Sequence, residues 1–174
     1  NETGVLQPIA ELVAALAEHP AYLHVDAAQT FGKRNEDLRH PRIDLISLSG
    51  HKVFAPQGVG ALVARRRGFK RPPLQPLVHG GGQERRIRPG TLPVALIAGF
   101  GLAAQQADQD ATQRNKQCRE FRDQVLQGLA PLGPVLHGDQ DHVLPHVLNF
   151  SIPGADSEAV MLVWRDLVAV SNGS

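Results

Sequence analysis

The chain contains a single cysteine, Cys118, among its 174 residues. One thiol excludes an internal disulfide framework and is consistent with a reducing compartment, so we expect a cytoplasmic protein. No apolar run is long enough to cross a membrane, and the chain does not open with a signal-like segment. Because Cys118 lies in a predicted helix beside Arg119 and Glu120, we interpret it as a bystander rather than a nucleophile.

The sequence also lacks an excess of charge of one sign. Its 18 basic and 17 acidic residues leave a formal net charge of +1, so no direct binding of nucleic acid is expected. A local cluster, here called the basic run, consists of residues 65–67 and 70–71. We interpret it as a solvated turn, with a contact surface as the alternative. The histidines and the cysteine show no paired ligand spacing, so no metal site is predicted.

Helix-like and strand-like patterns alternate along the first part of the chain. Apolar residues at helical spacing predict a helix that begins near Pro8 and ends at His19-Pro20. Near-continuous apolar runs predict strands at 22–25, 43–48 and 60–64, of the kind that is buried in a mainly parallel sheet. The glycine-rich polar segment 74–88 predicts a flexible loop. This alternation indicates an α/β fold.

The second part of the chain has a different pattern. A helix is predicted from Pro93 to about Gly128, and Thr112 marks a place where it could break. Strands are then expected at 135–136, 147–150 and 167–170, and a helix at 157–164. The tail therefore reads as a small α+β lobe. We divide the chain into residues 1–110 and residues 111–174.

Polar groups of complementary chemistry follow two of the predicted strands. One strand ends in Asp26, with Gln29 shortly after it, and the other is followed by Ser49-Gly50-His51-Lys52. Ligands of open α/β sheets bind beyond the carboxyl ends of strands, so these groups are expected to lie together. A lysine there can form a Schiff base with pyridoxal phosphate (PLP), while its hydroxyl and imidazole neighbours hold the phosphate. An aspartate can keep the pyridine nitrogen protonated. The pair of motifs predicts a PLP site.

Each of these residues also has an ordinary structural interpretation. Asp26 could cap a turn, Gln29 could be a solvated polar residue, and Lys52 could be an exposed loop lysine. The position of Asp26 at a strand end and the donors that precede Lys52 favour the functional interpretation. His24, inside a strand, is assigned to packing or to a supporting contact, and His79 is left open between the two kinds of role.

In this order, the residues resemble those of the cysteine desulfurases, which are PLP enzymes of fold type I in the class V aminotransferase group. The resemblance rests on NETG (1–4), HVDAAQ (24–29), SLSGHK (47–52), GVGAL (58–62), HGGGQER (79–85) and RPGT (88–91). It implies that residues 1–110 are the C-terminal part of a PLP-binding large domain with a mainly parallel sheet. Residues 111–174 would be part of the small C-terminal domain.

The resemblance also implies roles for individual residues. Lys52 would form the Schiff base, and Asp26 would pair with the pyridine nitrogen. Gln29 and Asn1 would contact the phenolic oxygen. The phosphate would be held by Ser49, His51 and Thr91. In the family, the threonine that matches Thr91 reaches the phosphate held by the partner subunit. A homodimer with shared sites is therefore implied.

The implied reaction converts L-cysteine to L-alanine and leaves the sulfur as a persulfide on an enzyme cysteine, from which a sulfur-acceptor protein takes it. In the family that cysteine follows a motif like Gly173-Ser174, where this chain ends, so we expect a piece of a longer enzyme. Another class V enzyme, either a selenocysteine lyase or an aminotransferase, is one alternative. An inactive fragment that keeps only dimer and partner contacts is another. Iron–sulfur cluster assembly, tRNA thiolation and DNA sulfur modification would all use the same chemistry.

Overall fold

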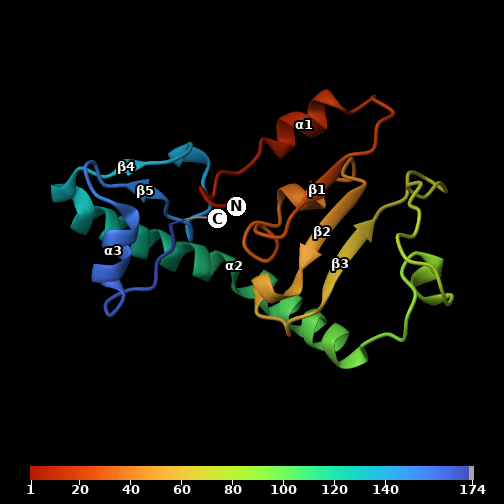
Figure 1. Cartoon of the computed structure of the whole chain (residues 1–174). Coiled ribbons are helices and arrows are strands. Elements are labelled where there is room, and N and C mark those ends of the chain that lie inside the picture. The colour runs from red at the N-terminus through yellow and green to blue at the C-terminus, as the bar shows by residue number, and fades with distance from the viewer. Residues whose placement is uncertain (173–174) are drawn as a thin grey trace. The chain divides into compact units, whose positions relative to one another are not determined.

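The computed structural model describes residues 1–172, which form two compact units (Figure 1). The large unit is Pro8–Thr112, and the small unit combines Asn1–Gln7 with the chain from Gln113 onward. The small unit thus includes the first residues of the chain as well as its C-terminal part. Within residues 1–172 no helix is both long enough and apolar enough to cross a membrane.

A three-stranded sheet with the order β1-β2-β3 forms the centre of the large unit. Its strands are β1 (His24–Asp26), β2 (Leu45–Ser49) and β3 (Gly60–Ala64). β1 and β2 are parallel, whereas β2 and β3 are antiparallel. The part of the sheet in this chain is thus mixed, because β3 adds an antiparallel strand to the expected parallel pair. The reason is the short connection from β2 to β3, since a parallel pair needs a crossover of a dozen or more residues.

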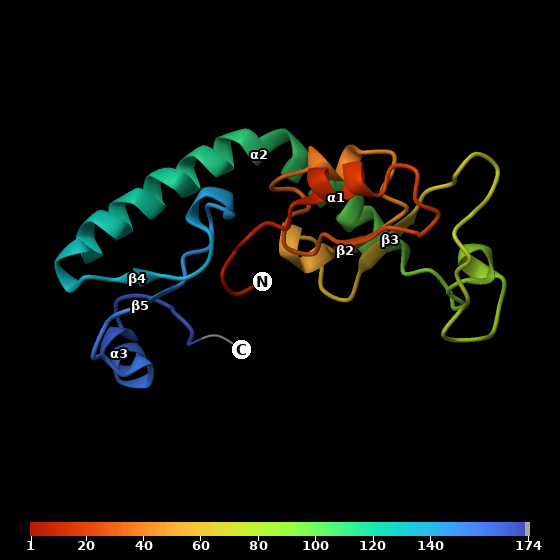
Figure 2. The same cartoon turned by 90° about the horizontal axis from the view of Figure 1, so that it is seen from above.

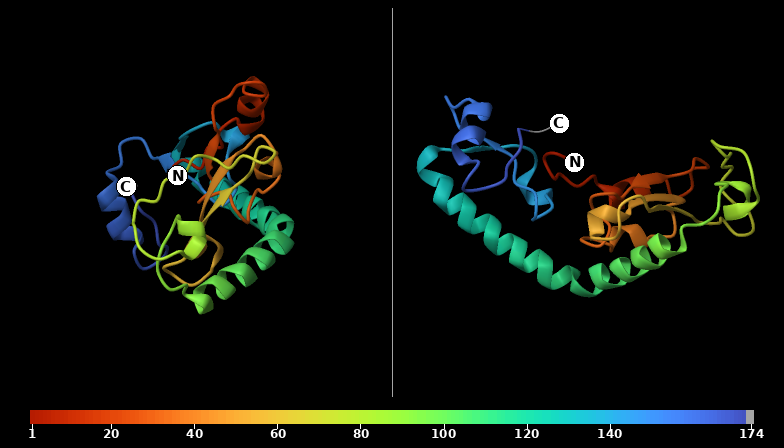
Figure 3. Two further views of the ribbon diagram at one scale, coloured as in Figure 1. Left: turned by 90° about the vertical axis from the view of Figure 1, so that its right-hand side faces the viewer. Right: turned by 60° about the horizontal axis from the view of Figure 1, so that its bottom comes forward.

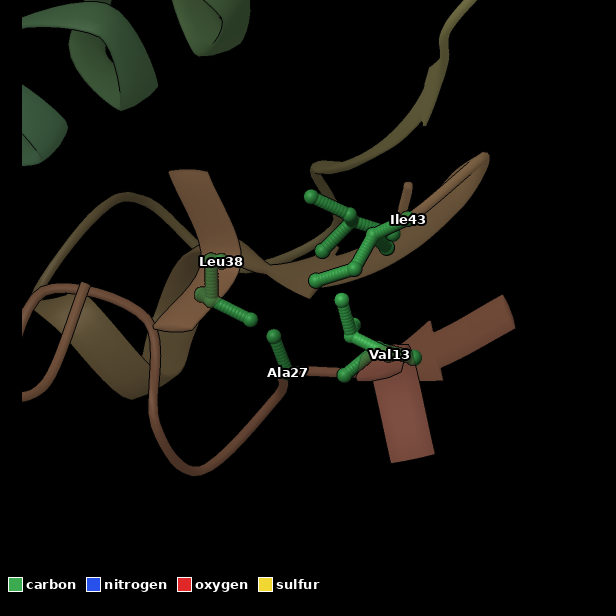
Figure 4. Packing of buried hydrophobic residues seen from close by; sticks show 6 residues of the cluster. Val13, Ala27, Leu38 and Ile43 are labelled. Carbon is green, nitrogen blue, oxygen red and sulfur yellow. The ribbon is translucent and has the colours of Figure 1, made fainter. Parts of the chain in front are cut away.

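One face of the sheet is covered by α1 (Ile9–Ala15), which ends earlier than predicted. The side chains buried between them belong to one cluster, namely Val13, Val25, Ala27, Leu38, Ile43 and Ile46 (Figure 4). Ala27 and Ile43 have no exposed surface at all. Burial of each large aliphatic side chain contributes about 1.5–3 kcal/mol, so this cluster is a main source of stability for the large unit.

The helix α2 (Val94–Leu129) begins in the large unit and covers the turn that follows β2 (Figure 2). Phe100, Ala103 and Ala107 recur at helical spacing and are buried against Val53 and Ala55. The helix continues through residue 112, so the predicted break is absent. The helix propensity of Thr112 does not decide whether the helix breaks, because a threonine inside a long helix costs only a fraction of a kcal/mol.

The small unit contains a two-stranded antiparallel sheet of β4 (Val135–Leu136) and β5 (Phe150–Ser151), together with α3 (Ser157–Trp164) (Figure 3). The side chain of Asp156 caps α3 by accepting a hydrogen bond from the backbone N–H of Ala159 at 2.9 Å. The first residues of the chain join this unit, because the N–H of Leu144 donates to the carbonyl of Gly4 at 2.9 Å. The bounds of α3 are those predicted from the sequence.

The prediction of a strand at 167–170 is wrong. The backbone N–H groups of Leu167 and Val168 both donate to the carbonyl of Trp164, so the chain forms a turn after α3. An apolar run becomes a strand only where another strand offers its edge, and in the part of the chain that the structure describes none pairs with this segment. The strand predicted at 147–150 overlaps β5 only at Phe150. The Gly173-Ser174 motif lies outside the described residues.

Candidate active site

Two of the predicted groups lie at the same edge of the sheet. Asp26 is the last residue of β1 and Ser49 is the last residue of β2, and these neighbouring strands run parallel with Asp26 opposite Ser47. The pairing continues for one step, because the N–H of Ala27 donates to the carbonyl of Ser47 at 3.0 Å. The carboxyl ends of both strands therefore meet, which is the arrangement that the sequence predicted.

The 3₁₀ turn η2 (Gly50–Val53) carries His51 and Lys52 and is fixed at both of its ends. The N–H of Gly50 donates to the carbonyl of Val59 at 3.0 Å, and a Cβ at position 50 would lie 2.6 Å from that oxygen. Only glycine allows this close approach. On the other side, Val53 and Ala55 are buried against α2. The backbone of the lysine-bearing turn is therefore held by packing.

Lys52 itself is partly buried. Within residues 1–172 its amine has no ion pair and no hydrogen bond. The side chain is thus less exposed than that of a fully solvated loop lysine. An amine without a competing anion is available for covalent chemistry.

Ser49 and His51 form a hydrogen-bonded pair next to the lysine. The Oγ of Ser49 lies 3.0 Å from Nδ1 of His51. Ser49 is partly buried and His51 is exposed, so the pair spans the boundary between the sheet and solvent. A hydroxyl and an imidazole are suitable donors to a phosphate.

Asp26 has the structural role that the sequence allowed, and this role leaves part of its carboxylate available. Its Oδ1 accepts a hydrogen bond from the N–H of Ala28 at 2.9 Å, so it caps the turn after β1. Its Oδ2 has no partner among the described residues and remains available at the strand end. The structural role therefore leaves one carboxylate oxygen for a cationic ligand group.

His24 makes a supporting contact and does not pack in the core. It is exposed, and its Nε2 lies 2.7 Å from Oγ of Ser47. His24 and Asp26 are two residues apart on β1 and share a face of the sheet, with Ser47 in register with Asp26. Ser47 was missed at the sequence level, although period-two alternation places it on the same face as Ser49.

The remaining predicted residues come from other segments of the chain. Gln29 lies on the turn after β1, and its carbonyl accepts a hydrogen bond from Nζ of Lys33 at 3.1 Å. Thr91 is exposed in the segment between the 3₁₀ turn η3 (Gln83–Arg86) and α2. Asn1 belongs to the small unit. The structure thus brings Asp26 and the segment that carries Ser49, His51 and Lys52 to one edge of the sheet, whereas Thr91 and Asn1 belong to other segments of the chain.

A buried ion cluster lies at the opposite end of β2, and the sequence did not reveal it. Asp44 directly precedes β2 and is 2% exposed. Its carboxylate accepts hydrogen bonds from Arg67 Nε at 2.6 Å, from Arg42 Nη1 at 2.9 Å and from the N–H of Leu23 at 2.7 Å. The hydrogen bond from Arg67 is the main reason that the pKa of Asp44 is lowered. This cluster ties β2 to the segments around β1 and β3.

Three other features of the described part of the chain bear on where a site could lie. No group of histidine, cysteine, aspartate and glutamate side chains there could hold a metal ion. A hollow of about 310 Å³ lies between α1 and the residues around the 3₁₀ turn η1 (Asp37–Arg39), and none of the predicted site residues lines it. Cys118 is partly buried on the portion of α2 that belongs to the small unit. None of these features competes with the strand-end site.

The donor set at the strand ends fits a phosphorylated aldehyde cofactor. It offers an amine for a covalent bond, a hydroxyl–imidazole pair for a phosphate, and a carboxylate for a ring nitrogen. These groups, at the carboxyl ends of parallel strands, define the class of PLP-binding α/β proteins. The chain belongs to the aminotransferase class V family, whose sequence model matches residues 1–174. Members of this family use PLP.

Several curated relatives are named cysteine desulfurases. The chain is 42% identical over 176 residues to cysteine desulfurase IscS of Ehrlichia chaffeensis. The alignment covers 100% of this chain and 42% of that protein. The chain is 40% identical over 175 residues to the mitochondrial cysteine desulfurase of Saccharomyces cerevisiae, of which it covers 35%. The chain therefore spans less than half the length of these relatives.

The chain is also similar to solved structures of DndA and of a NifS-like protein. All of the chain superposes on 49% of DndA from Streptomyces lividans with a TM-score of 0.88 and 52% sequence identity. A NifS-like protein matches 95% of the chain with a TM-score of 0.86 and 31% identity. The described fold is thus that of part of a fold type I enzyme.

Proposed function

We propose that the chain carries the lysine-bearing half of the active site of a PLP-dependent cysteine desulfurase. The enzyme converts L-cysteine to L-alanine and passes the sulfur to a cysteine of its own polypeptide and then to a sulfur-acceptor protein. The observation that carries this proposal is the state of Lys52, which is partly buried, without an ion pair, and held on a packed turn at the ends of two parallel strands. The names of the relatives support the choice of substrate.

When bound, PLP supplies an aldehyde that reacts with an amine and a protonated ring that withdraws electrons from the α-carbon of the substrate. The residues of the chain bind and orient this group. Lys52 provides the amine, Oδ2 of Asp26 holds the proton on the ring nitrogen, and the pair Ser49 and His51 donates to the phosphate. Gln29 and Asn1 are assigned to the phenolic oxygen. These roles follow from the chemistry of each group and from the resemblance.

The large unit corresponds in this proposal to the PLP-binding domain and the small unit to the C-terminal domain. Thr91 is exposed, as a residue that serves a partner subunit must be, which supports a homodimer with shared sites. We infer a cytoplasmic location from the single cysteine, and cell fractionation tests it, because the relatives include a mitochondrial enzyme.

The test begins with the cofactor. The full chain is incubated with PLP, and absorbance is recorded for the band of a lysine Schiff base. Borohydride then fixes the group covalently, and mass spectrometry locates it. We expect the label on the peptide that contains Lys52, and we expect neither band nor label in Lys52→Ala.

Lys116→Ala is the matched control, because this lysine is exposed and its nearest carboxylate oxygen is 4.0 Å away on Glu120. The control must keep both the band and the label. A band that persists in Lys52→Ala would contradict the proposal. For the reaction itself, the intact polypeptide should form alanine from L-cysteine without a keto acid, whereas an aminotransferase would require one.

A further inference from the structure

The residue that ends the lysine-bearing turn has a strained backbone. Phe54 follows η2 with a φ of 65° and a ψ of 18°, in the left-handed region. The Cβ of a bulky residue crowds the backbone there, so glycine or asparagine normally takes such a position. The large unit itself uses glycine at other positions of positive φ, namely Gly32, Gly58 and Gly68. A phenylalanine is therefore an unfavourable residue for this backbone.

Packing explains the backbone of residue 54 but not its ring. Val53 and Ala55, on either side, are 3% and 7% exposed and are buried against α2. The chain reverses between them, and the N–H of Ala55 donates to the carbonyl of Gly50 at 3.1 Å. The side chain of Phe54 is 81% exposed, so it contributes little burial free energy to the large unit. The reversal needs a left-handed residue and does not need a phenyl ring.

The position of this ring relates it to the reactive amine. Phe54 comes two residues after Lys52, so their Cα atoms lie at most about 7 Å apart, a distance that two long side chains can bridge. Backbone strain of this kind is most often found at active sites and ligand clamps. A strained aromatic residue on the turn that carries the partly buried Lys52 therefore indicates a role toward the ligand.

We propose that the ring of Phe54 forms an apolar wall beside the Lys52 amine and shields its covalent bond to the aldehyde of PLP from water. The amine nitrogen attacks the aldehyde carbon, a C=N bond forms, and the carbonyl oxygen leaves as water. The reverse reaction consumes one water molecule and returns the amine and the aldehyde. A wall that excludes water slows this reverse reaction. The inference rests on the function proposed above and adds a residue to that site.

The first measurement is PLP binding to the full chain. Absorbance titration gives the dissociation constant, and an excess of hydroxylamine, which captures free aldehyde, gives the rate of release. Phe54→Ala and Phe54→Gly should each weaken binding and speed release by about fivefold, as expected for the loss of one aromatic contact. Phe54→Leu keeps the apolar bulk and should stay within about twofold of the wild type. Phe69→Ala, at a residue that is 99% exposed on another segment, is the control and should change neither value.

Thermal unfolding without PLP separates the ring from the backbone. Phe54→Gly removes the ring and relieves the left-handed strain, whereas Phe54→Ala removes the ring and keeps the strain. Phe54→Gly should therefore melt about 2–4 °C above Phe54→Ala. Both variants should nevertheless lose the same amount of PLP affinity. A merely structural role would link the two quantities, with the weakest binding in the least stable variant, and that result would overturn the proposal.

The outcomes also distinguish this inference from the proposed function. If the borohydride label is found on Lys52 but the Phe54 variants bind and release PLP as the wild type does, only the shielding role is overturned. A wild-type chain without a lysine-dependent band would overturn both. Analytical ultracentrifugation of each variant covers one further case. A PLP affinity that falls only together with the dissociation of a dimer would overturn the shielding role and assign the ring to a subunit contact.

Discussion

The charged groups at the two ends of the central strand β2 differ in whether they have ion-pair partners. At the end where β2 begins, Asp44 is buried and its carboxylate is bonded by Arg42 and Arg67. At the end where β2 finishes, Lys52 has no counter-ion and Asp26 keeps one oxygen without a partner within the described part of the chain. The first arrangement fixes the strand, and the second leaves reactive groups available. Stability and reactivity are thus separated along one short strand.

The largest effect is expected from breaking the fixed end. Asp44→Asn leaves two guanidinium groups around a site without negative charge, and removal of one partner of a buried ion pair costs about 3–5 kcal/mol. Urea denaturation should show this loss in the free energy of unfolding. Arg34→Gln, which breaks only the exposed pair with Asp37, should change it by less than about 1 kcal/mol.

At the end of β2 near Lys52, a substitution should lower activity and leave stability unchanged. Asp26→Asn keeps a good turn cap but removes the charge that holds a proton on the ring nitrogen. We expect alanine formation by the intact polypeptide to fall by about a hundredfold, while the melting temperature stays the same. Asp26→Ala, which loses the cap as well, should lower both. Full activity in Asp26→Asn would remove this residue from the proposed site.

The turn between the two ends can be tested at Gly50. A Cβ there meets the carbonyl of Val59 at 2.6 Å, so Gly50→Ala must displace the backbone next to Lys52. We expect a destabilisation of about 1–3 kcal/mol and weaker PLP binding, measured by denaturation and by absorbance titration. Gly101→Ala on α2, where an added Cβ meets nothing within 4 Å, is the control and should be neutral or slightly stabilising.

The smallest effect is expected from pH in the ordinary range. The pKa of Asp44 is lowered by Arg67, so its contribution to stability is fully present above the ordinary carboxyl pKa. It is lost as the pH falls through the lowered value of the folded state. The melting temperature should therefore change little from neutral pH down to about pH 5 because of this group, and fall in stronger acid. Asp44→Asn should show a shallower fall over that acidic range.

The placement of the proposed reactive groups at one edge of the sheet could be predicted from the sequence because each group follows a recognisable strand. Asp26 and the Ser49 to Lys52 segment needed only the rule that ligands gather at strand ends. The fixed end was not predictable in this way. Arg42 and Arg67 come from different segments, and Arg67 looked like one more cation of a solvated turn.

The errors in the fold have a related cause. The near-continuous apolar pattern of β3 does not record strand direction, so its antiparallel pairing could not be inferred. The run at 167–170 is as apolar as a buried strand, but pairing depends on an edge that the local sequence does not describe. Local chemistry was readable, whereas partners distant in the chain were not.

The close approach of Gly50 to Val59 has a consequence for ligand binding. A loop that must first be ordered subtracts the entropy of that ordering from its affinity, at roughly 1–2 kcal/mol for each residue fixed. Here the backbone beside Lys52 is already immobilised by its neighbours. The backbone that carries the amine is therefore preorganised, and in the proposed site an incoming aldehyde would bind without a conformational penalty from this turn.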